Sequence, residues 1–288
     1  MSATISISIP RGPSLLQNVW TIAGRELRDA MRSRWFIMYT IAFAALGLGV
    51  SYVSAATSGG GMSGFGRTSA GLVNLVLLVV PLMALTAGAG SIASDRERGM
   101  LPYLLAQPVT RFELLFGKFV GLSLTLVASI CLGFGAVAGA LAWSGSATHP
   151  TSLLELAGLS IALALAMLSV GLLISVFAHR TGVATGTAVF VWLAFVFVSD
   201  LGLMAGAMTF KLPIEKLFAL ALLNPLQVFK MWSLQSVDAS LDVLGPAGLY
   251  AQETYGQLLN LIFGTCLLLW MCVPLCIASI AFSRRSSP

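Results

Sequence analysis

The stretch that decides the fold runs from Ser94 to Lys118 and reads SDRERGMLPYLLAQPVTRFELLFGK. One apolar run, Gly71–Ala93, precedes it, and a second, Leu114–Trp143, overlaps its end and continues beyond it. Each run is long enough to cross a bilayer as a helix, for which about 20 apolar residues suffice. The charged residues of the stretch therefore lie in a short connection between two membrane helices: Asp95, Arg96, Glu97, Arg98, Arg111, Glu113 and Lys118.

The composition of the whole chain excludes an ordinary soluble domain. Its 288 residues are 57% hydrophobic and only 9% charged, whereas a soluble domain carries about a quarter charged residues. Six apolar blocks are predicted to be helical, because lipid offers no hydrogen-bond partner to an open backbone. They are Trp35–Ala56, Gly71–Ala93, Leu114–Trp143, Leu153–Ala178, Val183–Phe210 and Leu258–Phe282. We expect an all-α membrane protein with six transmembrane helices.

The basic residues predict the orientation of these spans. If the amino terminus is cytoplasmic, 12 of the 16 Lys and Arg residues fall on the cytoplasmic side. The positive-inside rule then places both termini in the cytoplasm and the protein in the cytoplasmic (inner) membrane. The net charge of +5 thus follows from topology and does not predict nucleic-acid binding.

The chain before the first span predicts a helix at the membrane surface. Apolar residues from Leu15 to Met31 recur every three or four positions, and arginines fall on another face. Such a helix lies along the cytoplasmic interface with its apolar side in lipid; a solvated linker is the alternative. We expect residues 1–34 to form a tail and this interfacial helix, and residues 35–288 to form the six-span domain.

A short transverse helix is expected inside the charged connection. Ser94 and Glu97 form a capping-box pattern, Gly99 permits a tight bend, and the helix Leu101–Gln107 follows. Such a helix either docks into the groove of a soluble partner or is an interfacial turn anchored by Tyr103. The spacing alone does not decide between the two interpretations.

Asp200 is the ionisable residue that lies deepest in an apolar block. A carboxylate in hydrocarbon is costly, so its side chain should face the bundle, a cavity or an interface. It is either a cation or proton site, a polar lock between helices, or a residue at the outer boundary of the membrane. The boundary interpretation rests on its place as residue 18 of its block.

The longest segment between spans, Lys211–Gln257, is external on this topology. Its apolar parts, Leu217–Leu223 and Leu226–Leu234, are too short to cross a membrane and are separated by Asn224-Pro225. We expect two short helices that rest on the outer leaflet or cap the bundle. Because long loops without a function are uncommon, an external partner is expected here.

The sequence carries no pattern for nucleotide hydrolysis and no firm pattern for metal binding. It contains no GxxxxGK[ST] loop, so the chain is not expected to hydrolyse ATP by that route. His149 is interpreted as a loop residue. Cys272 and Cys276, four residues apart, either bind soft Cu(I) or are small apolar residues of the bundle. All four cysteines lie in predicted spans, so no disulfide framework is expected.

The charged connection resembles the first cytoplasmic loop of permease subunits of ABC-2 type ABC transporters. The residues that match are Asp95-Arg96-Glu97-Arg98-Gly99-Met100-Leu101, Leu104-Leu105, Pro108-Val109-Thr110-Arg111 and Gly117-Lys118, with Met100 where the family usually has Thr. The family also has an amino-terminal interfacial helix, six spans and external helices before the last span. The resemblance implies that a partner ATPase acts on these residues: Asp95, Arg96, Glu97, Gly99, Leu101, Leu104, Pro108 and Arg111.

Three further stretches are similar to permeases of the nitrous oxide reductase copper-maturation transporter: Gly117–Gly121, Trp192–Leu201 and Leu222–Pro225. This resemblance implies a homodimer of the chain, two cytoplasmic ATPase subunits that bind ATP-Mg, and a periplasmic partner that delivers copper to a metalloenzyme. The permease itself would bind no cofactor and catalyse no reaction. The alternatives are an ABC-2 exporter of a lipid, drug or polysaccharide, an intramembrane enzyme that uses Asp200, and a membrane scaffold.

Overall fold

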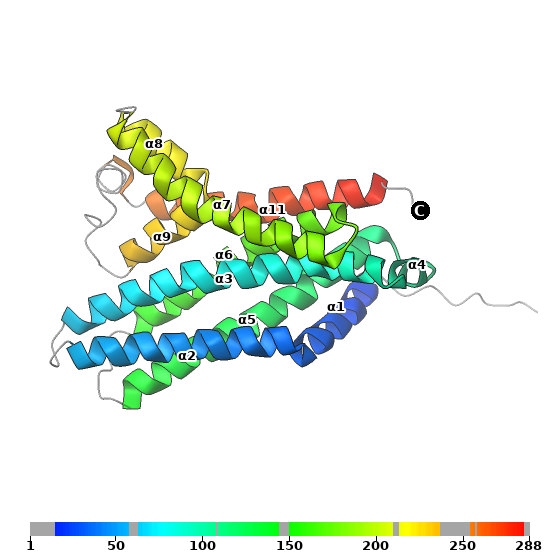
Figure 1. Cartoon of the computed structure of the whole chain (residues 1–288), viewed down its shortest axis with the longest axis horizontal. Helices are drawn as coiled ribbons and strands as arrows, with labels where there is room; N and C mark the ends of the chain where they lie inside the picture. Colours follow the sequence, from blue (N-terminus) through cyan, green and yellow to red (C-terminus); the bar gives the residue numbers. More distant parts are fainter. Residues whose placement is uncertain are drawn as a thin grey trace, which may run out of the picture.

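A computed structural model describes residues 15–57, 63–107, 109–143, 150–209, 213–236, 254–256 and 258–284. Figure 1 labels the helices in chain order. They are α1 (Leu15–Arg32), α2 (Arg34–Thr57), α3 (Ser63–Glu97), α4 (Met100–Leu105), α5 (Arg111–Trp143), α6 (Pro150–Phe177), α7 (Thr181–Met208), α8 (Ile214–Leu222), α9 (Pro225–Ser236) and α11 (Leu258–Arg284).

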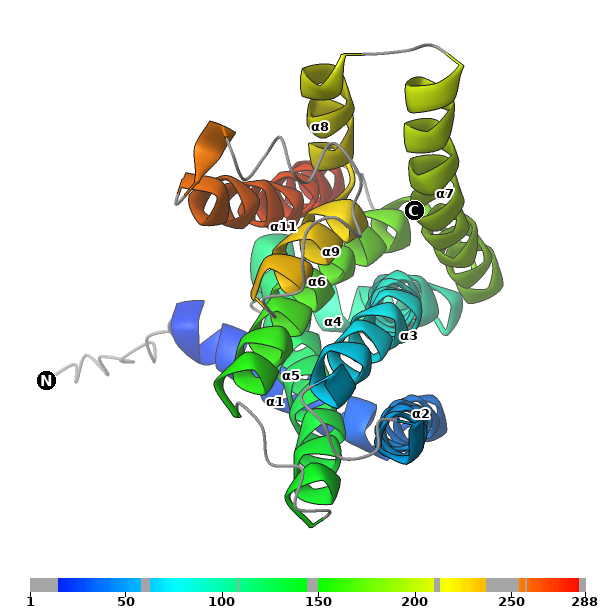
Figure 2. The ribbon, with the colours of Figure 1, turned by 90° about the vertical axis from the view of Figure 1, so that its left-hand side faces the viewer.

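The long helices form a bundle with α6 near its centre, as Figure 2 shows. Helices α3 and α11 pack against α6, and α7 lies against α3 on the outside of the bundle. Of the span in α6, 72% is buried inside the chain, compared with 6% of the span in α7. Helix α7 is therefore attached to the bundle along a narrow strip and leaves most of its surface uncovered.

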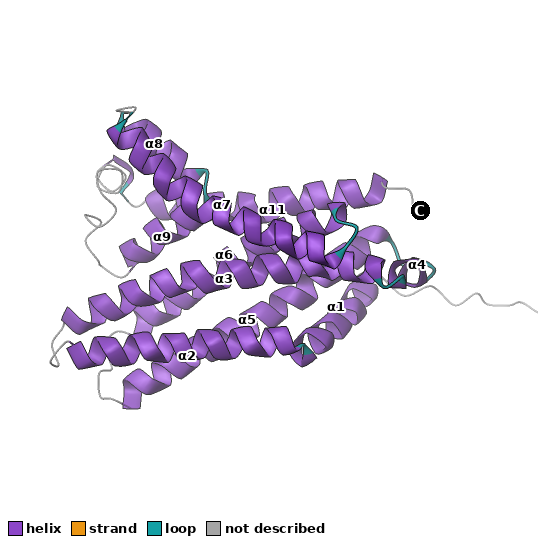
Figure 3. Cartoon of the chain, in the orientation of Figure 1, coloured by secondary structure: helices purple, strands orange, loops and turns teal. Residues whose placement is uncertain are grey.

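Within the described ranges every regular element is a helix and no strand occurs (Figure 3). Six helices are long and apolar enough to cross a membrane, namely α2, α3, α5, α6, α7 and α11. They match the six predicted spans in order, so the all-α, six-span prediction is confirmed. Helix α3 begins at Ser63, eight residues before the predicted span Gly71–Ala93. Extending an existing helix adds hydrogen bonds without a second nucleation cost.

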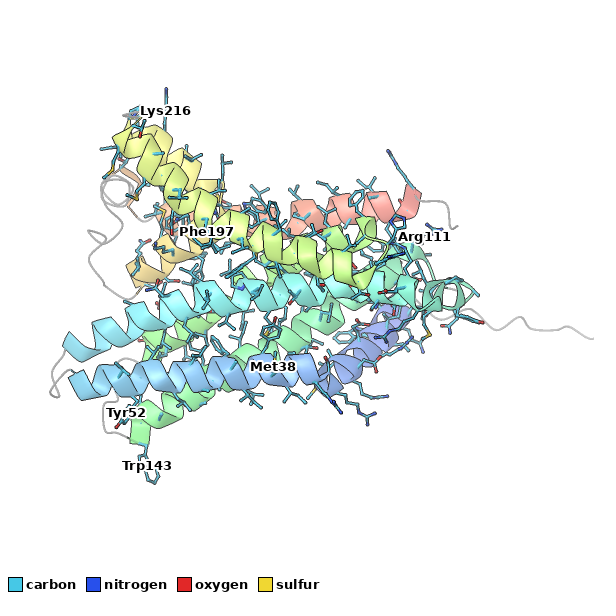
Figure 4. All side chains as sticks on the ribbon, in the orientation of Figure 1. Met38, Tyr52, Arg111, Trp143, Phe197 and Lys216 are labelled. Atoms are coloured by element: carbon cyan, nitrogen blue, oxygen red, sulfur yellow. The ribbon has the colours of Figure 1, made fainter. Side chains whose placement is uncertain are left out.

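The two ends of the bundle differ in what they carry. At one end, which we call the elbow end, lie α1, the protruding α4, the turn between α6 and α7, and the last residues of α11 (Figure 1). The opposite end, the far end, carries α8 and α9. Helix α5 runs from one end to the other, with Arg111 at the elbow end and Trp143 at the far end (Figure 4).

Helices α3 and α6 cross at two glycines. A Cβ atom added to Gly88 would lie 2.7 Å from the carbonyl oxygen of Leu168, and one added to Gly171 would lie 2.5 Å from the carbonyl oxygen of Leu85. Small residues of this kind allow helix backbones to approach closely in a membrane. The crossing fixes α3 directly against the most buried helix of the bundle.

Helix α1 forms where a helix was expected, but its apolar stripe is divided. Val19 and Ala23 are buried against α5, where a Cβ atom added to Gly121 would lie 2.7 Å from the carbonyl oxygen of Ala23. Leu16 and Trp20 are exposed. The helix is thus docked on the bundle by one side, and its position at a membrane surface stays a prediction.

The predicted pair of short helices after α7 is present as α8 and α9, bent by 108° relative to each other. Together they are apolar enough to count as one broken span. Helix α9 is largely buried and packs against α6 and α11, so it caps the bundle. Asn224 starts it: its Oδ1 accepts the N–H of Leu226 at 2.8 Å, and its Nδ2 donates to the Phe195 carbonyl of α7 at 2.6 Å. Positions 211–212, 237–253 and 257 of the predicted external segment lie outside the described residues.

Candidate functional site

The elbow, residues 94–111, joins α3 to α5 through the short helix α4. Helix α3 continues to Glu97, and Gly99 then turns the chain with a φ of 67°. This left-handed conformation costs little only for glycine, which explains why Gly99 stands at the bend. Helix α4 spans Met100–Leu105 and so ends two residues before the predicted Gln107. Pro108 lies outside the described residues.

The capping box expected at Ser94 and Glu97 is wrong. Ser94 lies inside α3, where its hydroxyl donates to the carbonyl oxygen of Ser91 at 3.3 Å. The box occurs instead at the start of α5. The N–H of Glu113 donates to Thr110 Oγ1 at 3.2 Å, and the N–H of Thr110 donates to Glu113 Oε2 at 2.7 Å. These two reciprocal bonds satisfy free amides of the first turn and fix where α5 begins.

Arg96 and Glu97 bond the elbow to the turn between α6 and α7. The guanidinium of Arg96 donates to the carbonyl oxygens of Val176, at 3.4 Å, and of Ala178 at the end of α6. The carboxylate of Glu97 accepts the N–H of Thr181, the first residue of α7, at 2.9 Å. A cation at a helix carboxyl end and an anion at a helix amino end are both favourable. Two adjacent elbow residues therefore cap two successive helices.

A buried lysine ties the elbow to α1 and α5. The side chain of Lys118 is only 4% exposed, and its Nζ lies 2.8 Å from Asp95 Oδ2 and 3.0 Å from Glu26 Oε2. It also donates to the carbonyl oxygen of Ser91 at 3.3 Å. A buried ammonium is stable only when it is paired and hydrogen-bonded in this way. We call Glu26, Asp95 and Lys118 the ionic cluster; it joins α1, α3 and α5.

Helix α11 holds the other side of the elbow. Arg111 donates from Nη1 to the carbonyl oxygen of Phe282 at 3.0 Å, and its guanidinium carbon lies 5.7 Å from the centre of the Phe282 ring. Leu101 of α4 is 8% exposed and packs in one apolar cluster with Ala278 and Phe282, with Leu104 at its edge. The elbow is thus bonded to or packed against α5, α6, α7 and α11.

Most of the eight residues that the resemblance assigns to coupling make contacts within the chain. Six of them are bonded or packed there, although Glu97 itself is exposed: Asp95, Arg96, Glu97, Leu101, Leu104 and Arg111. Other side chains form the exposed face of this end, which we call the elbow surface: Arg98, Met100, Tyr103, His179 and Arg180. Tyr103 of α4 has 77% of its surface exposed. Sequence reasoning missed His179 and Arg180, because only the fold brings the α6–α7 turn beside the elbow.

Asp200 lies toward the far end of α7 and is linked to α9. Its Oδ1 accepts a hydrogen bond from Gln227 Nε2 at 2.6 Å and lies 4.0 Å from Lys230 Nζ. These residues border a cleft of about 180 Å³ beside Asn74 of α3. Helix α7 continues past Asp200 to Met208, so the helix does not end there. The bond to Gln227 is what a polar lock between helices predicts; the Asp200 side chain is 60% exposed, and the other two interpretations stay predictions.

The cysteines and histidines are not gathered into a metal centre in the part of the chain that the structure describes. No three or more side chains of His, Cys, Asp or Glu come together there in a way that suits a metal ion. Cys272 and Cys276 are exposed on α11. His149 falls outside the described residues.

Comparisons with known proteins match nearly the whole chain. A family model described as "ABC-2 family transporter protein" matches residues 20–287. The chain is 32% identical over 277 residues to the "Probable ABC transporter permease protein NosY" of Stutzerimonas stutzeri, covering 94% of this chain and 99% of that relative. It is 33% identical over 229 residues to the protein of the same name from Pseudomonas aeruginosa, covering 77% of this chain and 83% of that relative.

Proposed function

Because the chain belongs to the ABC-2 family of transporter proteins, we propose that it receives the energy of ATP hydrolysis from partner ATPase subunits at its elbow surface. The chain is a multi-pass membrane permease subunit, similar to NosY over nearly its full length. The main support for the proposal is that the elbow protrudes from the bundle and is bonded to it on both sides. Its helix α4 protrudes and exposes Tyr103, while its flanks are bonded to α5, α6, α7 and α11.

We place the elbow end in the cytoplasm, where the ATPases bind ATP-Mg. Most basic residues of the described ranges lie at this end, including those of α1 and the elbow, whereas Lys216 and Lys230 lie at the far end. The positive-inside rule therefore favours cytoplasmic termini. A second copy of the permease completes the proposed assembly. The largely uncovered α7, whose Gly182 and Gly186 face open space, offers a close-packing surface for another helix.

The elbow bonds provide a route for movement into the bundle. A displacement of α4 acts on α6 and α7 through Arg96 and Glu97, and on α11 through Arg111. At the far end, Asp200 passes the movement of α7 to α9 through Gln227. A partner shifts such a system only by the difference between its affinities for the two conformations. The ATPases must therefore bind the elbow surface with higher affinity in one of their nucleotide states than in the other.

We further propose that the transporter serves the copper maturation of nitrous oxide reductase, together with a periplasmic partner. The support is the similarity to NosY proteins and the position of the residues that resemble the copper-maturation permeases. Two of those stretches, Trp192–Leu201 and Leu222–Pro225, meet in the structure through the bond between Asn224 and the Phe195 carbonyl. The link between α7 and α9 is thus built largely from them, at the end that would face the periplasm.

Substitution of Tyr103 by Ala tests the ATPase contact. We expect the amount of ATPase that co-purifies with the permease in mild detergent to fall at least about tenfold, because a central aromatic anchor of an interface contributes about 2 kcal/mol or more. The matched control is Tyr52→Ala, since Tyr52 is also 77% exposed but lies on α2, at the far end of the bundle (Figure 4). Equal ATPase capture by both variants, or no capture by the unmodified chain, contradicts the proposal.

Deletion of the gene from its own organism tests the copper role. We expect nitrous oxide reductase to accumulate with less than about a tenth of its normal copper, and re-expression of the unmodified chain to restore it. The measurement is metal analysis of the purified reductase, with a second periplasmic copper enzyme as the control that stays loaded. Normal copper in the reductase of the deletion strain would overturn this role and leave the ATPase contact standing.

A further inference from the structure

The elbow surface carries two arginines that the chain does not pair with a carboxylate. Arg98 follows the end of α3, Arg180 stands directly before α7, and both residues are exposed. In the part of the chain that the structure describes, no ion pair includes either arginine. Their positive charges are therefore presented to water or to a partner.

The other two arginines of the elbow are used within the chain. Arg96 donates to the carbonyl oxygens at the end of α6, and Arg111 donates to the carbonyl oxygen of Phe282 in α11. These bonds hold neighbouring helices together, so Arg96 and Arg111 have a structural role. Arg98 and Arg180 are the arginines of the elbow surface that remain for an interaction with another molecule.

The fold brings Arg98 and Arg180 together from distant parts of the sequence. Glu97 joins their two segments, because its carboxylate accepts the N–H of Thr181 at 2.9 Å. Both guanidinium groups act electrostatically on this carboxylate, so both lie near it. Two positive charges thus share one carboxylate that is already bonded to Thr181, and an excess of positive charge remains.

An apolar area lies beside these charges. Met100 and Tyr103 of α4 are 39% and 77% exposed. Protein interfaces commonly have aromatic and methionine side chains in their core and polar groups at their rim, and arginine is enriched in them. The elbow surface has the composition of such an interface, with its charged part positive.

From this arrangement, and on the basis of the proposed function, we propose that the ATPase receives the elbow in a groove with an apolar floor and carboxylates on its rim. The floor contacts Met100 and Tyr103, and the carboxylates pair with Arg98 and Arg180. Pairs between guanidinium and carboxylate groups are frequently bidentate and directional, so they fix the orientation of the elbow in the groove. An ATPase with a basic rim is rejected, because like charges repel each other across an interface.

The positive-inside rule supplies a competing explanation for the two arginines. It places basic residues at the cytoplasmic end of a membrane protein whatever surface they occupy. On that explanation alone, Arg98 and Arg180 contribute no more to ATPase binding than Arg32, an exposed arginine at the end of α1. The two explanations therefore predict different results for the same substitution at these positions.

Charge reversal in the full-length chain tests the proposal. The permease is immobilised in mild detergent, and the captured ATPase is identified by its own GxxxxGK[ST] sequence. We expect the double variant Arg98→Glu, Arg180→Glu to capture at least about tenfold less ATPase, because its acidic side chains face the acidic rim. The matched control, Arg32→Glu, should capture as much ATPase as the unmodified chain.

A neutral double variant, Arg98→Gln, Arg180→Gln, provides a second measurement. Raising the NaCl concentration from about 50 mM to about 300 mM should lower capture by the unmodified chain, because salt screens exposed charges. The neutral variant should capture less ATPase at the lower concentration and lose little more at the higher one. If the charge-reversed variant is not monodisperse in size-exclusion chromatography, this salt dependence decides.

The acidic rim is overturned if a monodisperse charge-reversed variant captures as much ATPase as the unmodified chain. An equal loss in Arg32→Glu overturns it as well, since the general charge of this end is then the cause. Tyr103→Ala separates these outcomes from the proposed function: a loss of capture in that variant leaves the ATPase contact standing without a charged rim. No capture by the unmodified chain overturns both.

Discussion

Replacement of Lys118 by Met is expected to lower the free energy of unfolding by about 3–5 kcal/mol, the cost of leaving buried charges without their partner. Methionine keeps the long unbranched side chain and removes only the ammonium. The carboxylates of Asp95 and Glu26 then face each other at the junction of α1, α3 and α5. The fraction of folded protein across a denaturing-detergent titration, in otherwise constant micelles, measures the change.

The triple variant Lys118→Met, Glu26→Gln, Asp95→Asn separates charge imbalance from lost packing. It should recover most of the stability, since removing all members of a buried ionic group is often neutral. Lys216→Met is the matched control, because Lys216 is exposed at the far end (Figure 4), and it should change the unfolding free energy by less than about 0.5 kcal/mol. If the Lys118→Met protein is as stable as the unmodified chain, the ionic cluster contributes nothing to the free energy of unfolding.

Substitution of Gly171 by Val is expected to be comparably damaging. The new Cβ would lie 2.5 Å from the carbonyl oxygen of Leu85 and 3.1 Å from the Cα of Gly88. Overpacking costs about 1–3 kcal/mol and occasionally more. The upper end applies here, because backbone atoms of α3 cannot rotate away and the two helices must separate. The yield of monodisperse protein in size-exclusion chromatography and the unfolding midpoint measure the effect.

The control for this variant lies on the same helix. A Cβ atom added to Gly158 meets nothing within 4 Å, so Gly158→Val adds the same side chain to α6 without a clash. It should change the stability by less than about 0.5 kcal/mol beyond the small difference in helix propensity. Equal losses from the two substitutions would mean that the crossing with α3 is not the cause.

The spans could be predicted because the bilayer imposes one rule on every residue it contains. Backbone groups in lipid must be bonded within their own helix. The first predicted span, Trp35–Ala56, therefore agrees with α2 to within one residue at each end. The rule does not apply where the chain leaves the lipid and meets water and charged residues. Helix α3 runs on to Glu97 because Lys118 and the end of α6 supply partners for its charges, and those partners are distant in sequence.

The same limit explains the errors at the site. The Ser/Thr-x-x-Glu pattern occurs at Ser94 and again at Thr110, and only the fold shows that the second one caps a helix. Both α6 and α7 carry glycines, yet a Cβ atom added to Gly182 meets nothing within 4 Å, whereas one added to Gly171 would lie 2.5 Å from the carbonyl oxygen of Leu85 in α3. Small residues in one helix predict a close contact with another helix, but they do not identify that partner helix.

The order of the ionic cluster along the chain has a consequence for biosynthesis. Glu26 and Asp95 both precede Lys118 in the sequence, and the ribosome delivers a polypeptide from its amino terminus. When α5 emerges for insertion, the two acidic side chains that will neutralise its lysine have already been synthesised. Exchanging Lys118 with Glu26 would leave the same three charges in the finished protein. The first charged residue of the cluster to be synthesised would then be the lysine, before either carboxylate that pairs with it.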